Sequence, residues 1–109
     1  MKYPFYDGDF ENWKDVCTWF NMNEPEPDEV LVAIYDIDGY DGYAHVVYRN
    51  GRKYYLNYGS HCSCYGLEDQ WEPEEFSSKK LLIAFLEKSS DDWKFGKVNS
   101  ELAEYLKNR

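Results

Sequence analysis

Residues 43–58 read YAHVVYRNGRKYYLNY, two runs of aromatic and β-branched residues separated by Asn50-Gly51. Residues of these types favour strands. Asn-Gly between two such runs is the strongest short-range hairpin signal, because both central positions of a type I′ turn need positive φ. Closure by two residues predicts these cross-strand pairs: Arg49 with Arg52, Val47 with Tyr54, His45 with Leu56, and Tyr43 with Tyr58.

The residues before this hairpin extend it into a sheet. Residues 30–37 are apolar or aromatic at almost every position, as expected for a strand buried on both faces. Gly39 and Gly42 then supply turn chemistry before the hairpin begins. The stretch 30–58 therefore predicts a three-stranded antiparallel meander.

An amphipathic helix is predicted ahead of the meander. Asp9 can cap a helix over residues 9–21, and Phe10, Trp13, Val16 and Phe20 follow at helical spacing on one face. The next segment, 23–29, reads NEPEPDE, and its prolines exclude both a helix and a central strand. We expect it to be an acidic loop.

Helices are also predicted after the meander. Ser77 can cap one that runs to about Lys88, with Phe76 and Leu81 placed to form a hydrophobic staple. Asn99 can cap a short last helix over 99–107. The connection 59–76 has no clear periodicity, and so long a connection in a small domain is functional or hides a short strand.

These elements predict one α+β domain spanning residues 1–109. A small antiparallel β-meander of three or more strands is packed by an N-terminal helix and by one or two C-terminal helices. Aromatic residues make up 19% of the 109 residues, which supplies enough large side chains to fill a core. The chain is therefore expected to fold without a metal, a cofactor or a disulfide.

The charge of the chain is strongly negative and unevenly distributed. The formal net charge is −9, residues 1–75 hold 16 acids and 5 bases, and residues 76–109 hold 5 acids and 7 bases. A negative field repels phosphate, which excludes direct nucleic-acid binding, and it attracts basic protein surfaces. Acidity that only keeps the protein soluble is the alternative. No apolar run suits a membrane helix or a secretory signal, so a cytoplasmic location is expected.

Residues 59–75 read GSHCSCYGLEDQWEPEE. This segment resembles one found in small proteins of bacteriophages and other mobile elements, which carry a similar Gly-Ser-His-Cys-Ser-Cys followed by Gly, Leu, Glu, Gln-Trp, Pro and Glu. The resemblance covers about 17 residues, with weaker likeness in the preceding hairpin. It implies a phage origin and no particular chemistry.

A metal-binding or thiol-based site is the first hypothesis for this segment. His61, Cys62 and Cys64 are ligand types that zinc accepts, but a structural site needs four ligands, and only Cys17 and His45 remain to complete it. The same residues do not match a known nucleophile signature. A tight turn with a buried thiol is the simpler interpretation.

A partner-binding surface is the second and favoured hypothesis. The residues assigned to it are Glu68, Asp69, Trp71, Glu72, Glu74 and Glu75. Spaced carboxylates on a rigid scaffold can imitate a nucleic-acid backbone, by analogy with anti-restriction and anti-CRISPR inhibitors. Trp71 adds an aromatic of the kind that anchors interfaces, unless its ring lies in the core. The sequence thus predicts a non-enzymatic, phage-encoded protein that binds a host protein with a basic surface.

Overall fold

The computed structural model describes residues 1–62 and 66–109, and it confirms the α+β class. The elements are β1 (Phe5–Gly8), α1 (Trp13–Phe20), β2 (Glu29–Asp38), β3 (Asp41–Asn50), β4 (Lys53–His61), β5 (Glu74–Phe76), α2 (Lys79–Lys88) and α3 (Gly96–Lys107). All strands belong to one sheet in the order β1-β2-β3-β4-β5, in which β1 runs parallel to β2 and the other neighbours are antiparallel.

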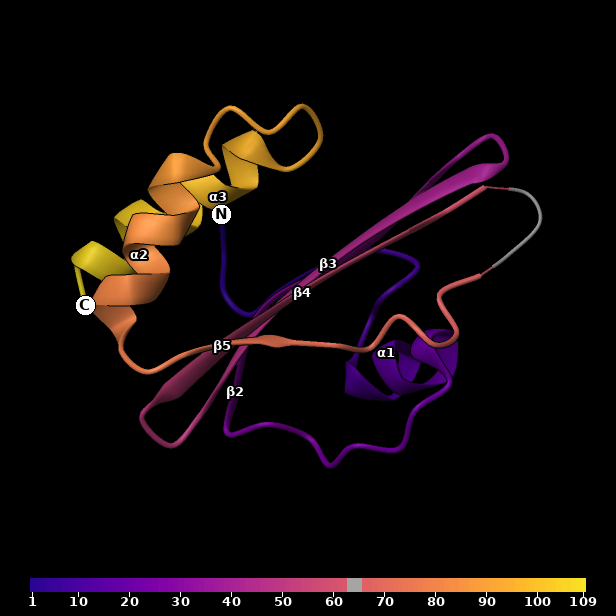
Figure 1. Ribbon diagram of the computed structural model, residues 1–109, viewed down its shortest axis with the longest axis horizontal. Helices are drawn as coiled ribbons and strands as arrows, with labels where there is room; N and C mark the ends of the chain where they lie inside the picture. The colour runs from indigo at the N-terminus through magenta and orange to yellow at the C-terminus, as the bar shows by residue number, and fades with distance from the viewer. Residues whose placement is uncertain (63–65) are drawn as a thin grey trace.

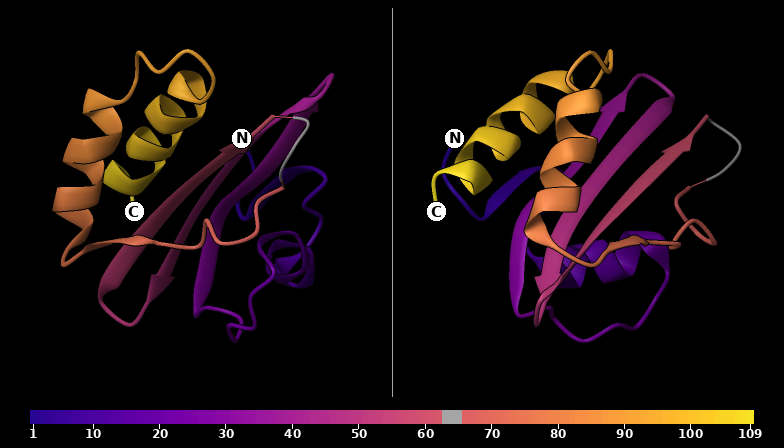
Figure 2. Two further views of the ribbon diagram at one scale, coloured as in Figure 1. Left: turned by 45° about the vertical axis from the view of Figure 1, so that its right-hand side comes forward. Right: turned by 60° about the vertical axis from the view of Figure 1, so that its left-hand side comes forward.

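The sheet separates two layers. Helices α2 and α3 cover one face, and α1 with the segments around it covers the other (Figure 1). The two additional orientations in Figure 2 show the same division. We call these the helix-pair side and the α1 side. Each side has its own cluster of buried residues.

The predicted meander is present, and β2 is buried on both faces as expected. Residues 30–35 are all buried. A bulge between Val30 and Val32 changes the alternation, so Leu31 and Val32 both pack on the helix-pair side, while Val30 and Ala33 pack on the α1 side. The division of the β3 and β4 side chains between the two faces also follows the predicted alternation.

The predicted register of the second hairpin is wrong. Asn50 pairs with Lys53, so Gly51 and Arg52 form the turn, and every partner lies two residues further along β4 than expected. Only Gly51, with φ of 62°, has positive φ, as in a type II′ turn. A tertiary contact selects this turn: Asp28 Oδ2 accepts from Gly51 N at 2.8 Å, and Asn50 Oδ1 accepts from Asp28 N at 2.9 Å.

The helix starts also differ from the predicted caps. Helix α1 begins at Trp13 because Asn12 Oδ1 accepts from Asp15 N at 3.0 Å, whereas the Asp9 N–H donates to the Tyr35 carbonyl. Ser78 instead of Ser77 caps α2, and Leu81 is 52% exposed, so the predicted staple does not form.

Helix α3 begins earlier than predicted, and its predicted cap lies inside it. The helix starts at Gly96, and Asn99 is fully buried within its first turns. Strand β1 was not predicted, since four residues are too few to show a period. Strand β5 is the short strand that the 59–76 connection hid.

Candidate partner-binding surface

Two side-chain amides, those of buried Asn57 and half-buried Gln70, fix the segment that carries the predicted acidic site. Beyond Leu56, β5 no longer covers β4, and the Gln70 side chain takes the position of a neighbouring strand. Gln70 Nε2 donates to Ser60 O at 2.8 Å, and Gln70 Oε1 accepts from Ser60 N at 2.9 Å. Asn57 Nδ2 donates to Gln70 O at 3.2 Å, while Asn57 Oδ1 accepts from Glu72 N at 2.9 Å. The acidic segment is therefore held firmly against the sheet edge.

All five acids of the predicted site are exposed. Glu75 forms an ion pair with Lys53 at 3.3 Å, and it accepts from the Tyr55 hydroxyl. The other four make no ion pair with any residue that the structure describes. Three of them, Asp69, Glu72 and Glu74, line a hollow of about 400 Å³ beside β4. The structure thus brings most of the predicted acids to one place.

Trp71 lies among the aromatic rings of the α1 side. Its ring centroid is 5.0 Å from that of Phe20, 5.8 Å from that of Trp13 and 5.9 Å from that of Tyr48. These contacts agree with the alternative interpretation, in which the Trp71 ring belongs to the core.

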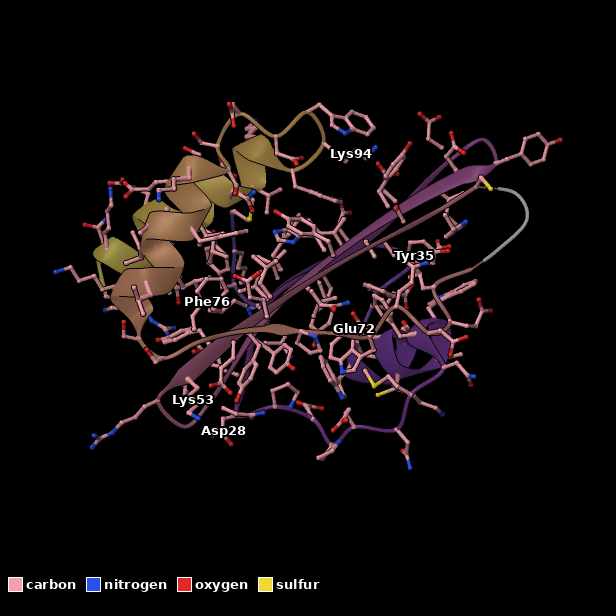
Figure 3. The ribbon with its side chains drawn as sticks, in the orientation of Figure 1. Asp28, Tyr35, Lys53, Glu72, Phe76 and Lys94 are labelled. Carbon is pink, nitrogen blue, oxygen red and sulfur yellow. The ribbon has the colours of Figure 1, made fainter. Side chains whose placement is uncertain are left out.

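Trp13 connects the two acidic segments of the chain. Its indole packs edge-on against Trp71, and its Nε1 donates to the Glu24 carbonyl at 2.9 Å. The loop 21–28 and the segment 66–73 therefore border the same helix. Figure 3 shows Tyr35 and Glu72 on this side of the sheet, and Phe76 toward α2. We call the exposed acids of residues 9–28 and 68–75 the acidic face.

His61 is occupied by two hydrogen bonds. Its Nδ1 lies 2.9 Å from the Cys62 carbonyl oxygen, which can only accept, so Nδ1 carries the proton. Nε2 then accepts from the Tyr35 hydroxyl at 2.5 Å. Burial raises the pKa of Tyr35, with Asp9 and Glu68 adding to the effect, which keeps the hydroxyl protonated. The ring fits only because Gly42 lies opposite, where a Cβ would be 2.2 Å from Nε2.

The predicted metal or thiol site has little support in this arrangement. In the neutral ring, neither His61 nitrogen is free for a metal. Across residues 1–62 and 66–109, no three His, Cys, Asp or Glu side chains come together as metal ligands. Cys62 is exposed, and Cys17 Sγ donates to the Glu24 carbonyl at 3.4 Å. Cys64 lies outside the described residues.

His45, the other histidine considered for that site, lies on the opposite face of the sheet. It is fully buried, its ring stacks on Tyr58 at 4.5 Å, and Nε2 is 2.8 Å from Asn99 Oδ1. Since that oxygen only accepts, Nε2 carries the proton. Burial lowers the pKa of His45 to about 4, although Asn99 and Asp92 act in the opposite direction. His45 thus connects the sheet to α3 as a neutral ring.

The residues that position this surface were not predicted from the sequence. Asn57 and Gln70 are ordinary polar residues in the sequence, and only their position beside an open strand edge gives them their role. Tyr35 was recognised as a strand residue but not as the partner of His61. The one available signal was Asn57, a polar residue that the strand alternation places on the same face of the hairpin as Val46 and Tyr48.

Comparisons with protein-family models, curated proteins and solved structures find no match to this chain. Among the described residues, no helix combines the length and the apolar character that crossing a bilayer requires.

Proposed function

We propose that this protein is a non-enzymatic, phage-encoded binding protein whose acidic face docks on a basic surface of a host protein. The host protein would be one that handles nucleic acid or takes part in defence. The acidic face would occupy the groove that normally holds a phosphate backbone, and so inhibit or modulate that protein.

The uneven distribution of charge along the chain carries this proposal. Residues 76–109, which include α2 and α3, hold the net positive part of the chain, whereas residues 1–75 hold 16 acids and 5 bases. Acids that served solubility alone would have no reason to gather in one part of the chain. A one-sided field instead orients an approaching basic surface and speeds encounter with it.

The rigidity of the acidic segment supports the same function. Carboxylates can imitate regularly spaced phosphates only if their backbone is fixed. Asn57 and Gln70 anchor residues 60, 66, 70 and 72 by five hydrogen bonds that need no partner molecule. Preorganisation of this kind reduces the entropy lost on binding.

The experiment compares two variants of equal net charge as baits in a host lysate. The test variant neutralises Glu68, Asp69, Glu72, Glu74 and Glu75 to the corresponding amides. The control variant neutralises the same number of acids away from the acidic face: Asp38, Asp41, Asp91, Glu101 and Glu104. We expect the wild type and the control to capture the same partner and the test variant to lose it.

The captured partner is then measured against salt. Its affinity for the wild type should fall as salt rises from 0.1 to 1 M, because the Debye length falls from about 10 Å to about 3 Å. For the test variant, the association rate constant should fall by a larger factor than the dissociation rate constant rises. A partner whose affinity does not change with salt, or that binds both variants equally well, would contradict the proposal.

A further inference from the structure

A second hollow lies at the edge of α1, away from the segment 68–75. It has a volume of about 450 Å³ and lies between the N-terminal residues, the start of α1, the loop before β2 and the end of α3. Its walls combine aromatic rings with carboxylates, and the residues that matter here are Tyr3, Tyr6, Trp13, Tyr105, Glu26 and Glu29.

The hollow is suited to a cation. Three carboxylates line it, from Glu26, Asp28 and Glu29, and no lysine or arginine does among the described residues. Aromatic faces attract a cation through their quadrupole, most strongly where water is partly excluded. Burial, with a contribution from Glu26, raises the pKa of Tyr6, so this ring stays neutral beside the carboxylate.

The chain's own last residue shows how two of these walls hold a guanidinium group. Arg109 donates to both Glu29 oxygens, from Nη1 at 2.6 Å and from Nη2 at 2.7 Å. The same guanidinium lies 5.5 Å from the centroid of the Tyr105 ring. A paired carboxylate and a facing ring are the two features that distinguish arginine recognition from lysine recognition.

Glu26 and Tyr6 offer a second set of the same two groups. Glu26 is exposed, and it makes no ion pair with any residue that the structure describes. Tyr6 is half-buried and borders the same hollow. Glu29 is already engaged by Arg49 and Arg109, and Asp28 accepts a hydrogen bond from Gly51 N, which leaves Glu26 as the carboxylate without a hydrogen bond or ion pair among the described residues.

We propose that this hollow receives an arginine side chain of the partner protein, held between the Glu26 carboxylate and the Tyr6 ring. The inference rests on the proposed function, because it identifies one residue of the basic partner that the acidic face would recognise. The general charge of the acidic face would guide the encounter, and the hollow would select the residue at its edge. A planar guanidinium can pair and stack at once, whereas an ammonium group acts as a point charge.

Small probes test the hollow without the partner. N-acetyl-arginine methylamide, its lysine counterpart and the neutral citrulline counterpart are titrated into the isotopically labelled protein. The indole N–H resonance of Trp13 is followed, assigned by its loss in Trp13→Phe. We expect the arginine probe to shift this resonance at lower concentration than the lysine probe, and the citrulline probe to leave it unchanged. Equal responses to arginine and citrulline, or a stronger response to lysine, would overturn the proposal.

Two variants of equal charge locate the binding. Glu26→Gln should weaken binding of the arginine probe about two- to fivefold, the range for an exposed ion pair with a stacked ring. Glu24→Gln, in the same loop but outside the hollow, should leave it unchanged. If both variants behave alike, the hollow is not the site. That result would leave the salt dependence of partner binding untouched, so the inference and the proposed function can fail separately.

Discussion

The two faces of the sheet are packed by different kinds of side chain. The helix-pair side is mainly aliphatic, with Leu31, Leu56, Leu82, Leu86, Leu102 and Leu106 among its buried residues. The α1 side is richer in aromatic rings, with Phe10, Trp13, Phe20, Tyr35 and Tyr48 buried and Trp71 packed against them. The first face is closed by two helices of 10 and 12 residues, and the second by one helix of 8 residues.

The difference shows how a small domain can combine stability with an exposed charged surface. Two helices supply enough aliphatic side chains to seal one face, and their charges form ion pairs such as Lys107 with Glu87. One short helix cannot cover the other face, so large rings must bury the remaining area. The loops that carry these rings also carry the acids.

The largest expected effect concerns Trp71 on the aromatic side. Because the ring packs on Trp13, Phe20 and Tyr48, Trp71→Ala should lower the free energy of unfolding by about 3 kcal/mol, as for other truncated core aromatics. Trp93→Ala is the control, since that ring is 74% exposed, and it should cost less than about 0.5 kcal/mol. Denaturant unfolding measures both. If Trp71→Ala is as harmless as the control, Trp71 is free to serve as an interface anchor.

A pH effect is expected from the helix-pair side, at His45. His45 is neutral in the fold, with its pKa lowered from 6.5 to about 4, so the unfolded chain takes up a proton first as the pH falls. The stability from this residue is complete above pH 6.5 and is lost as the pH falls toward 4. The shift corresponds to about 3 kcal/mol.

His45→Gln isolates this contribution from that of the carboxylates. The variant removes the titrating ring, so its free energy of unfolding should change less between pH 7 and pH 4 than that of the wild type. Chemical denaturation across this pH range measures the difference in slope. Parallel curves for the two proteins would show that His45 is not the buried neutral group described here.

A smaller effect is expected at the turn between β3 and β4, which is hydrogen-bonded to Asp28 in the loop before β2. Gly51 has φ of 62°, so Gly51→Val should destabilise the protein by about 1–2 kcal/mol through backbone strain. Arg52→Val changes the neighbouring turn residue, which has no positive φ, and should stay within about 0.5 kcal/mol. Thermal unfolding of the two variants measures both changes, and equal losses would contradict a positive φ at Gly51 alone.

The smallest effect is expected from chelators and reductants. The described cysteines, Cys17 and Cys62, are free, and neither takes part in a cluster of metal ligands among the described residues. Thermal stability should therefore change by less than about 0.5 kcal/mol when either reagent is added. A loss of about 3 kcal/mol, the size of a structural crosslink or metal site, would restore the thiol segment as a stabilising element of the α1 side.

Periodicity and composition determined much of this protein. The alternation in residues 43–58 fixed which side chains face each layer, and the apolar run 30–37 fixed a strand buried on both faces. The spacing of Phe10, Trp13, Val16 and Phe20 identified the buried face of α1. Charge counts alone located the acids in the first 75 residues. These features are local, so one sequence suffices to read them.

Tertiary contacts decided the rest. The hairpin register depended on Asp28, which lies 23 residues from Gly51, and no local pattern contains that contact. Asn99 has the character of a helix cap, yet the need of His45 for a buried acceptor placed it inside α3. Asn57 and Gln70 acquired their roles only when β5 ended after three residues and left part of β4 unpaired. A buried polar group must find a partner wherever the fold supplies one, and the sequence does not record where that partner will lie.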